Sequence, residues 1–314
     1  MARERLPQSS QDAHQERDAR EPNRAGRREQ VSDDTAAPGL HIVATPIGNL
    51  GDITVRALDI LNGVDTILCE DTRVTRKLLS RYRIATKTTA YNDHNARRVL
   101  PKLMERLNGG DSLALVSDAG TPLISDPGFR LVEAAIAGDI PVQTLPGPSA
   151  TIAGLVLSGL PTDGFFFAGF PPPRSAARRR RFQELAAVPG SLVFYESPQR
   201  LAACLEDLHA VLGDRPAAVA RELTKLHEEL VRGPLADLAE RYGTSDPPRG
   251  EIVLLVGPPP AAEVGDDAVQ AALTDALKDL SLRDAVAQIT AVTGRARRDV
   301  YRLALEISGE DDGG

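Results

Sequence analysis

From Leu40 onwards, short apolar runs alternate with stretches whose apolar residues recur at helical spacing. The apolar runs, which predict strands, are LHIVAT, VDTILCE, TKTTAY, SLALVS and IPVQTL. The stretches between them predict helices near 55–61, 74–82, 95–107 and 129–137, the third with Asn95 as its N-cap and Pro101 inside it. Because strands that alternate with helices are typical of βαβ units, we predict an α/β domain with a largely parallel sheet over residues 39–146.

A second α/β domain is predicted over residues 147–258, with strands at FFFAG, SLVFYE, AVAREL, HEELVRG and EIVLLVG. Several of these strands are short and joined by compact turns, which favours a mixed sheet over a purely parallel one. Residues 259–265 read as a Pro-rich linker. Beyond it, residues 266–308 predict a small helical domain with helices at 267–280, 282–292 and 297–307.

Residues 1–38 are rich in Arg, Glu, Asp, Gln and Ser and lack aliphatic periodicity, so we predict a disordered tail. The chain has no apolar h-region behind its N-terminal charges, and no apolar run approaches the roughly 18 residues of a membrane span. Its two cysteines, Cys69 and Cys204, lie in apolar patterns and suggest neither a disulfide framework nor a zinc site. These features predict a cytoplasmic protein without a membrane partner.

The formal net charge of −7 argues against a generally basic nucleic-acid-binding surface, so any RNA contact must be regional. Two arginine clusters stand out, one opening a helix after PPPR and one in the C-terminal helical segment. A charge run usually marks a solvated helix face, but such concentrated clusters also suit contact with phosphates. The candidate RNA-binding residues are Arg178, Arg179, Arg180, Arg181, Arg295, Arg297 and Arg298.

Three loops rich in Gly and Pro follow predicted strands, at 45–52, 117–128 and 145–150. In open α/β sheets, ligands bind at the carboxyl ends of the strands. Gly lets the backbone approach a ligand closely and Pro keeps the loop rigid, although either residue also occurs in simple tight turns. The longest loop, SDAGTPLISDPG, carries Asp118 and Asp126 and has the polarity of a ligand-binding segment.

Motifs of several common enzyme classes are absent. The chain has no GxGxxG after its first strand, no GxxxxGK[ST], no HExxH and no GxSxG, which weakens assignments to dinucleotide oxidoreductases, P-loop NTPases, zinc proteases and α/β-hydrolases. Charged residues at other strand ends could instead converge on a cleft. They lie in FYESPQR (194–200), ARELTKLHEE (220–229), CEDTRVTRK (69–77) and YNDHN (91–95).

The succession TPIGNLGDIT, CEDTR, NDHN, ALVSDAGTPLISDPG, LPGPSA, FYESPQR and RELTK resembles the small-subunit ribosomal RNA cytidine 2′-O-methyltransferases of the tetrapyrrole methylase superfamily. The resemblance extends from about Leu40 to Ile307. It implies two α/β domains with S-adenosylmethionine in the cleft between them, a homodimer, and small-subunit ribosomal RNA, within the 30S subunit, as partner. The implied cofactor-binding residues are Pro46, Gly48, Asp118, Gly120, Thr121, Ser125, Gly147, Pro148, Ser149, Tyr195 and Glu196.

The implied reaction is attack of a ribose 2′-oxygen on the cofactor methyl group, with no need for a metal. A ribose hydroxyl is a poor nucleophile near neutral pH, so a general base or a cation should assist. Candidate bases are Glu222, His94 and Asp118, and candidate cations are Lys225 and Arg73. Two alternatives stay open: a methyltransferase acting on a tetrapyrrole, and a non-catalytic RNA-binding ribosome-assembly factor.

Overall fold

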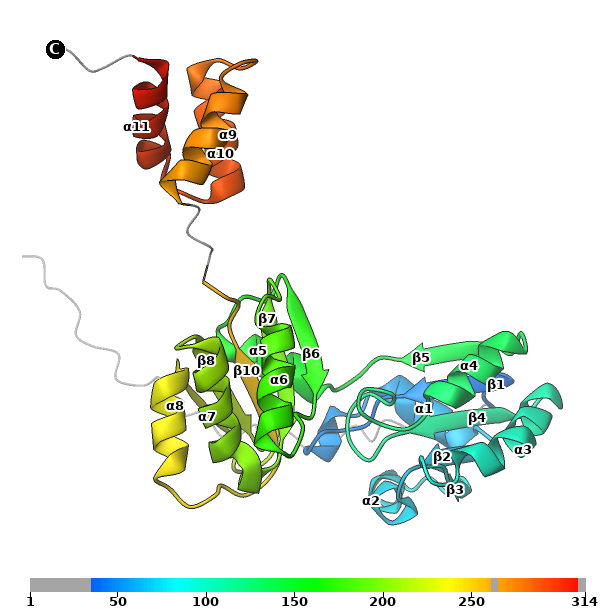
Figure 1. Cartoon of the computed structure of the whole chain (residues 1–314). Helices are drawn as coiled ribbons and strands as arrows, with labels where there is room; N and C mark the ends of the chain where they lie inside the picture. The colour runs from blue at the N-terminus through cyan, green and yellow to red at the C-terminus, as the bar shows by residue number, and fades with distance from the viewer. Residues whose placement is uncertain (1–34, 261–264, 310–314) are drawn as a thin grey trace, which may run out of the picture.

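The computed structural model describes residues 35–260 and 265–309, which form two α/β domains followed by a group of helices (Figure 1). Most of the predicted tail (1–34) and part of the predicted linker (261–264) lie outside the described residues, as do residues 310–314. Within the described ranges, no helix combines the length and the apolar composition that a membrane crossing requires.

The first sheet is entirely parallel and has the strand order β3-β2-β4-β1-β5. Its strands are β1 (Gly39–Val43), β2 (Thr66–Cys69), β3 (Thr88–Ala90), β4 (Ser112–Val116) and β5 (Val142–Leu145). Every residue of β1, β2 and β4 is buried, because helices cover both faces of the sheet. This burial explains why these strands read as continuous apolar runs.

One face of this sheet packs against α1 (Val55–Gly63) and α2 (Thr72–Tyr82), which share a core with the buried side chains of Val43, Ile67 and Val116. The other face packs against α3 (Ala96–Asn108) and α4 (Phe129–Ala137). Helix α3 continues through Pro101. Asn95 stands at its N-cap position, but the side chain donates to the carbonyl of Ala90 and makes no cap bond. A short 3-10 helix, η1 (Leu50–Asp52), precedes α1.

The second sheet has the order β6-β7-β10-β8-β9, with β6 and β7 parallel and the other pairings antiparallel, as the prediction of a mixed sheet requires. Its strands are β6 (Phe165–Gly169), β7 (Ser191–Glu196), β8 (Pro216–Arg221), β9 (Glu229–Pro234) and β10 (Ile252–Val256). Helix α5 (Ala150–Ser158) packs on one face through Leu155. The other face packs against α6 (Ser175–Leu185), α7 (Leu201–Leu212, after the 3-10 helix η2, Pro198–Arg200) and α8 (Leu235–Gly243).

Three C-terminal helices, α9 (Asp266–Ala276), α10 (Leu282–Thr293) and α11 (Arg297–Ser308), pack around a core of their own. Val269, Leu273, Val286, Val300 and Leu303 form most of this core. The group stands apart from the two sheets in Figure 1, beyond the end of β10. Each of the three helices predicted from the spacing is present.

Candidate functional site

The three Gly- and Pro-rich loops lie together, because they follow β4, β1 and β5, which are neighbours in the first sheet. The backbones of Thr45 and Gly120 exchange two hydrogen bonds, with N···O distances of 2.8 and 3.0 Å. The hydroxyl of Thr121 donates to the carbonyl of Pro148 at 3.1 Å. The loops thus support one another and form a single edge of the site.

The longest loop has an unusual backbone. Leu123 (φ 73°) and Ser125 (φ 65°) adopt left-handed conformations that non-glycine residues rarely occupy. Gly128 (φ 144°) begins the turn into α4, and a Cβ atom there would come 2.7 Å from Cδ2 of Leu115. Strained backbone of this kind concentrates at ligand sites, because only the surrounding structure can maintain it.

A cavity of about 390 Å³ lies between this loop edge and the second domain. Its size falls within the range of roughly 300–1,000 Å³ typical of small-molecule sites. Seven of the predicted cofactor-binding residues line it: Asp118, Gly120, Thr121, Ser125, Ser149, Tyr195 and Glu196. We call it the first cavity.

Aromatic rings form one wall of the first cavity. Tyr195 meets Phe170 edge-to-face, with ring centroids 5.5 Å apart, and Phe167 packs on Tyr195 at 4.9 Å. The phenol oxygen of Tyr195 lies 2.8 Å from the hydroxyl of Thr151, and burial raises the pKa of Tyr195. This wall is therefore apolar and neutral.

Two acids of the longest loop, Asp118 and Asp126, line the first cavity, and Glu70 lies near them outside its lining. Burial, together with the nearby charges of Glu70 and Asp118, raises the pKa of Asp126 to about 6. Burial also raises the pKa of Asp118, although the backbone N–H of Asp71 donates to its Oδ1 at 3.2 Å and opposes that effect. Burial raises the pKa of Glu70 as well. Such a group of acids favours a ligand that carries positive charge.

A second cavity of about 370 Å³ lies on the other side of a wall formed by Ile47, Asp118, Ala119 and Glu251, which line both cavities. Helix α2 contributes Val74, Thr75, Lys77 and Leu78 to it, and the predicted residues Pro46, Gly48 and Lys225 line it too. The two cavities therefore adjoin, with Asp118 exposed to both.

Lys225 reaches the second cavity from a turn after β8. Its ammonium lies 2.7 Å from Oε1 of Glu222 and 3.1 Å from Oε2 of Glu251. The bond from Lys225 lowers the pKa of Glu222. Burial opposes the charge of Lys225, but the two carboxylates outweigh burial and raise its pKa. Glu222 lines neither cavity, so its carboxylate holds Lys225 in place.

The first loop fits closely against this turn. The backbone N–H of Asn49 donates to Oγ1 of Thr224 at 3.1 Å, across the boundary between the domains. A Cβ atom at Gly48 would lie 2.4 Å from Cγ of Lys225. Glu222 (φ 51°) and Thr224 (φ 65°) both have left-handed backbones, so the turn is strained where it touches the loop.

Some predicted residues are not brought to either cavity. His94 is exposed beyond β3 at the edge of the sheet. The side chain of Arg73 is 85% exposed and pairs with Asp71 at 2.6 Å. Gly147 packs against Ala44. Pro148 contributes only its carbonyl oxygen, which accepts the hydrogen bond from the Thr121 hydroxyl.

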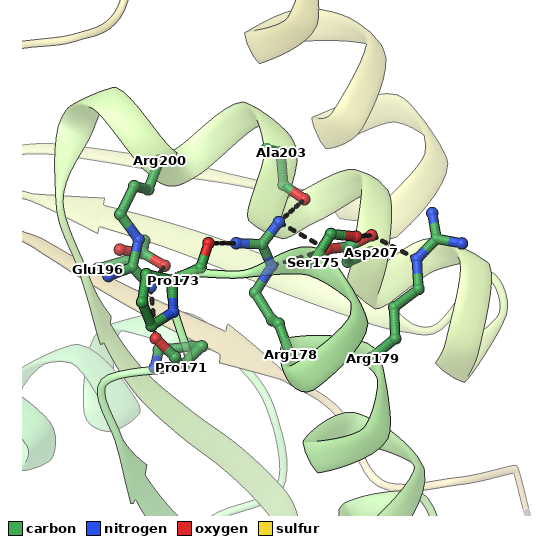
Figure 2. A network of polar contacts seen from close by, with 9 residues as sticks. All are labelled: Pro171, Pro173, Ser175, Arg178, Arg179, Glu196, Arg200, Ala203 and Asp207. Atoms are coloured by element: carbon green, nitrogen blue, oxygen red, sulfur yellow. Dashed lines mark hydrogen bonds and ion pairs between the residues drawn. The ribbon is translucent and has the colours of Figure 1, made fainter.

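One predicted RNA-binding residue is wrong. Arg178 is only 3% exposed, since its guanidinium contacts Asp207 at 2.5 Å and donates to the carbonyl of Ala203 at 3.1 Å (Figure 2). Arg179 also binds Asp207, at 2.5 Å, and Arg181 binds Glu184 at 2.9 Å. Arg178 thus links α6 to α7 in the interior of the domain. It cannot contact a phosphate unless a buried ion pair breaks.

The C-terminal arginines differ in their surroundings. Arg297 is exposed at the start of α11. Arg298 lies 3.8 Å from Asp299, and its side chain is almost fully exposed. Arg295 pairs with Asp266 and so joins α9 to the turn before α11. The first two remain accessible to a ligand, whereas Arg295 also stabilises the helical group.

An ion pair between the half-buried Arg200 and the buried Glu196 fixes the rim of the first cavity. The guanidinium of Arg200 donates to Oε2 of Glu196 at 3.1 Å and to the carbonyl of Pro171 (Figure 2). Glu196 also accepts from the backbone of Ser197 at 2.8 Å. Arg200 therefore ties the end of β7 to the segment beside Phe170.

Several lining residues of the first cavity were not predicted. Ile47, Ile124, Phe170, Leu223 and the segment 250–253 contribute apolar side chains or backbone. Of these, only Ile47 and Ile124 lie in the predicted loops. Except for Glu251, the others carry no polar signal in the sequence, because their contribution depends on how the two domains meet.

The sequence-family model of the tetrapyrrole (corrin/porphyrin) methylases matches residues 39–239. The family model of the RsmI C-terminal HTH domain matches residues 263–308. A ribosomal RNA small subunit methyltransferase I from Mesorhizobium japonicum is 49% identical over 88% of this chain and 96% of its own length. The same-named protein from Vibrio cholerae is 47% identical over 87% and 96%, respectively.

Solved structures show the same fold at low identity. A diphthine synthase aligns with a TM-score of 0.55 and 16% identity over 70% of this chain and 89% of its own. Uroporphyrin-III C-methyl transferase from Thermus thermophilus, complexed with S-adenyl homocysteine, aligns with a TM-score of 0.50 and 19% identity over 70% and 97%. The resemblance seen in the sequence motifs is thus confirmed: the chain belongs to the tetrapyrrole methylase family and, within it, to the ribosomal RNA small subunit methyltransferase I group.

Proposed function

We propose that this protein transfers a methyl group from S-adenosylmethionine to the 2′-oxygen of a cytidine ribose in small-subunit ribosomal RNA. The observation that carries the proposal is the position of Asp118, whose side chain lines two adjoining cavities. A methyl transfer needs its donor and acceptor next to each other, and adjoining cavities with a shared wall provide that proximity.

The first cavity suits the cofactor. Its aromatic wall around Tyr195 and Phe170 matches a flat heterocycle, and the acids Asp118 and Asp126 match the positive charge of a sulfonium and an ammonium group. Gly120 (φ 83°) has no side chain, so a ligand can approach the loop backbone closely there. The fold neighbour from Thermus thermophilus in complex with S-adenyl homocysteine supports this choice of cofactor.

The second cavity suits the acceptor nucleotide. Lys77, which enters no ion pair among the described residues, brings positive charge to it and favours a ligand with a phosphate; Lys225 lines it too but is paired with Glu222 and Glu251. The names of the relatives, ribosomal RNA small subunit methyltransferase I, support small-subunit ribosomal RNA as that acceptor. The ribose 2′-oxygen of a cytidine follows from the resemblance of the motifs.

When bound, S-adenosylmethionine supplies an electrophilic methyl group on a positively charged sulfur, which leaves as neutral S-adenosylhomocysteine. Asp118 takes the proton from the ribose hydroxyl, because it lines both cavities and its raised pKa makes it a better base than an ordinary aspartate. Lys225 stabilises the negative charge that develops on the oxygen, and Glu222 positions Lys225.

The homodimer and the intact 30S subunit as substrate are also part of the proposal. Exposed apolar side chains on α5 and β6, Ile152, Val156 and Phe165, support a contact with a second copy of the chain. Val156 is 70% exposed, so Val156→Glu should shift the sedimentation coefficient towards that of a monomer. The cytoplasm, where ribosomal subunits assemble, is the proposed location.

The decisive experiment incubates the purified protein with methyl-labelled S-adenosylmethionine and small ribosomal subunits that lack the modification. We expect label in the RNA, at a ribose. Label in an added tetrapyrrole instead of RNA would favour the first alternative that the sequence leaves open. Cofactor binding without label in any acceptor would favour a non-catalytic assembly factor.

A further inference from the structure

Helix α2 has a basic outer face, of which only Lys77 lines a cavity. Its sequence, TRVTRKLLSRY, contains four basic residues and no acidic one, and Arg83 follows directly. Thr75, Leu78 and Leu79 are buried against the sheet, whereas Arg76, Lys77 and Arg81 are exposed. Because buried and basic positions alternate at helical spacing, the charges gather on one side of the helix.

These charges are free. In the part of the chain that the structure describes, Arg76, Lys77, Arg81 and Arg83 enter no ion pair. Three of the four arginines of α6 differ, since Arg178, Arg179 and Arg181 are paired with carboxylates; Arg180 is exposed and enters no ion pair among the described residues. A chain with a net charge of −7 therefore presents unneutralised positive charge along α2, which attracts phosphates.

The basic face borders the proposed acceptor site. Lys77 lies on it and also lines the second cavity, together with Val74 and Leu78 from the same helix. The N-cap residue of α2, Asp71, donates its backbone N–H to Asp118. At 1.5 Å per residue, the 11 residues of α2 are about 16 Å long, and Arg81 and Arg83 lie beyond the part of the helix that lines the cavity.

We infer that the outer face of α2, formed by Arg76, Lys77, Arg81 and Arg83, is the surface on which the phosphate backbone of the RNA acceptor docks beside its target nucleotide. This inference rests on the proposed function. Arginine binds phosphates through two parallel hydrogen bonds, and lysine adds a point charge at the cavity mouth. The surface would hold the strand in register and carry no sequence information of its own.

The test compares two triple variants of the full-length protein with equal loss of charge. One is Arg76→Gln/Arg81→Gln/Arg83→Gln on α2. The matched control is Arg97→Gln/Arg98→Gln/Lys102→Gln on α3, which lies on the opposite face of the same sheet and has the same exposed, unpaired character in the described residues. The measurements are capture of small ribosomal subunits over a range of salt concentrations, the KM for subunits, and the Kd for S-adenosylmethionine.

We expect the α2 variant to bind subunits at least tenfold more weakly and to lower the slope of log K against log salt by about 2 to 3, as three lost phosphate contacts predict. Its cofactor Kd should stay that of the unmodified protein, and Arg76→Lys/Arg81→Lys/Arg83→Lys should retain most of the affinity. Equal affinities of the α2 and α3 variants would overturn the inference. A lack of methyl transfer by the unmodified protein would instead contradict the proposed function.

An acidic protein partner is the competing occupant of this surface. If the α2 variant methylates free ribosomal RNA and assembled subunits as efficiently as the unmodified protein does, RNA does not dock there and the inference fails. If the loss of affinity is the same for protein-free ribosomal RNA as for subunits, the phosphate backbone is the partner.

Discussion

Lys225 donates to Glu222 and Glu251 at once, with Nζ 2.7 Å from the first carboxylate and 3.1 Å from the second. Of these three residues, only Lys225 and Glu251 line the second cavity. The sequence alone made Glu222 and Lys225 equal candidates for a catalytic role. Their geometry separates them, since Lys225 faces the acceptor site and Glu222 lies behind it.

Lys225→Met should therefore lower the rate of methyl transfer in single-turnover experiments by about 100-fold, the usual effect of removing one charge-stabilising group. Glu222→Gln keeps the shape and part of the hydrogen bonding of the turn, so it should lower the rate by less than tenfold with no change in the pH profile. Loss of the acidic limb of that profile in Glu222→Gln would identify Glu222 as the general base.

Asp118→Asn should reduce the rate by at least 100-fold while the cofactor still binds. The base must be ionised, and burial raises the pKa of Asp118. The rate of the unmodified enzyme should accordingly fall as the pH drops through this raised pKa, above the range of an ordinary aspartate. In Asp118→Asn the residual rate should lack that limb. An unchanged limb in the variant would assign the base to another residue.

Asp126 should make cofactor affinity depend on pH. Its pKa of about 6 means that it is largely protonated at pH 5 and largely ionised at pH 7. An ionised carboxylate attracts a cationic ligand, so the affinity for S-adenosylmethionine should rise as the pH increases through about 6. Calorimetric titration between pH 5 and 8 measures this effect. Asp126→Asn should abolish most of the rise, and an equal rise in that variant would assign it to another group.

The raised pKa of Asp126 also predicts an effect on the free energy of unfolding. The pKa of Asp126 is raised above its unfolded value of 3.8, so its ionisation costs folding free energy as the pH rises from about 4 to about 6. Asp126→Asn should stabilise the cofactor-free protein at pH 7 by roughly 1 kcal/mol, less than the full shift implies because water screens a half-exposed group. The gain in denaturant unfolding should vanish near pH 4.

Arg200 should act as a positioning residue for the aromatic wall. Arg200→Met removes the bonds to Glu196 and Pro171, so the segment with Phe170 loses its anchor. We expect the Kd for S-adenosylmethionine to increase about tenfold, which corresponds to about 1.4 kcal/mol, with a smaller change in the rate at saturation. Gln199→Ala, at the exposed neighbouring position, is the control. A fall in rate without a change in Kd would contradict this role.

The C-terminal helices should contribute to RNA capture alone. Because α9, α10 and α11 share a core of their own, removing residues 265–314 should leave the cofactor Kd nearly unchanged. Subunit capture should weaken, and Arg297→Gln/Arg298→Gln in the full chain should reproduce part of that loss. If the truncation weakens cofactor binding as much as RNA capture, the helical group supports the two α/β domains instead.

Much of the fold could be predicted because its strands can be recognised from short stretches of the sequence. The buried strands β1 and β4 read as apolar runs, and the loops that follow them are marked by Gly and Pro. In a parallel sheet the loops after these strands lie at one edge, and the structure joins them there through Thr45 and Gly120. The site could be predicted to the same extent, since its first edge consists of these loops.

The remainder depended on contacts between distant segments. The run RSAARRRR looks uniformly exposed, yet Arg178 lies opposite Asp207, 29 residues further along, and is buried by that pair. Phe170 carries no polar signal and lines the first cavity only because Arg200 holds its segment there. The sequence also does not show that the basic residues of α2 are unpaired. Ion pairs depend on contacts between segments, and only an unpaired charge is available to bind a phosphate.

The wall of Ile47, Asp118, Ala119 and Glu251 has a consequence for inhibitor design. The two cavities lie on either side of this wall, so a ligand in one cavity leaves the other vacant. The kinetics should therefore follow a ternary-complex scheme, with donor and acceptor bound together. A compound that fills only the first cavity should compete with the methyl donor and leave ribosomal subunits free to bind. A molecule that bridges the wall at Asp118 would combine both affinities in a single bisubstrate ligand.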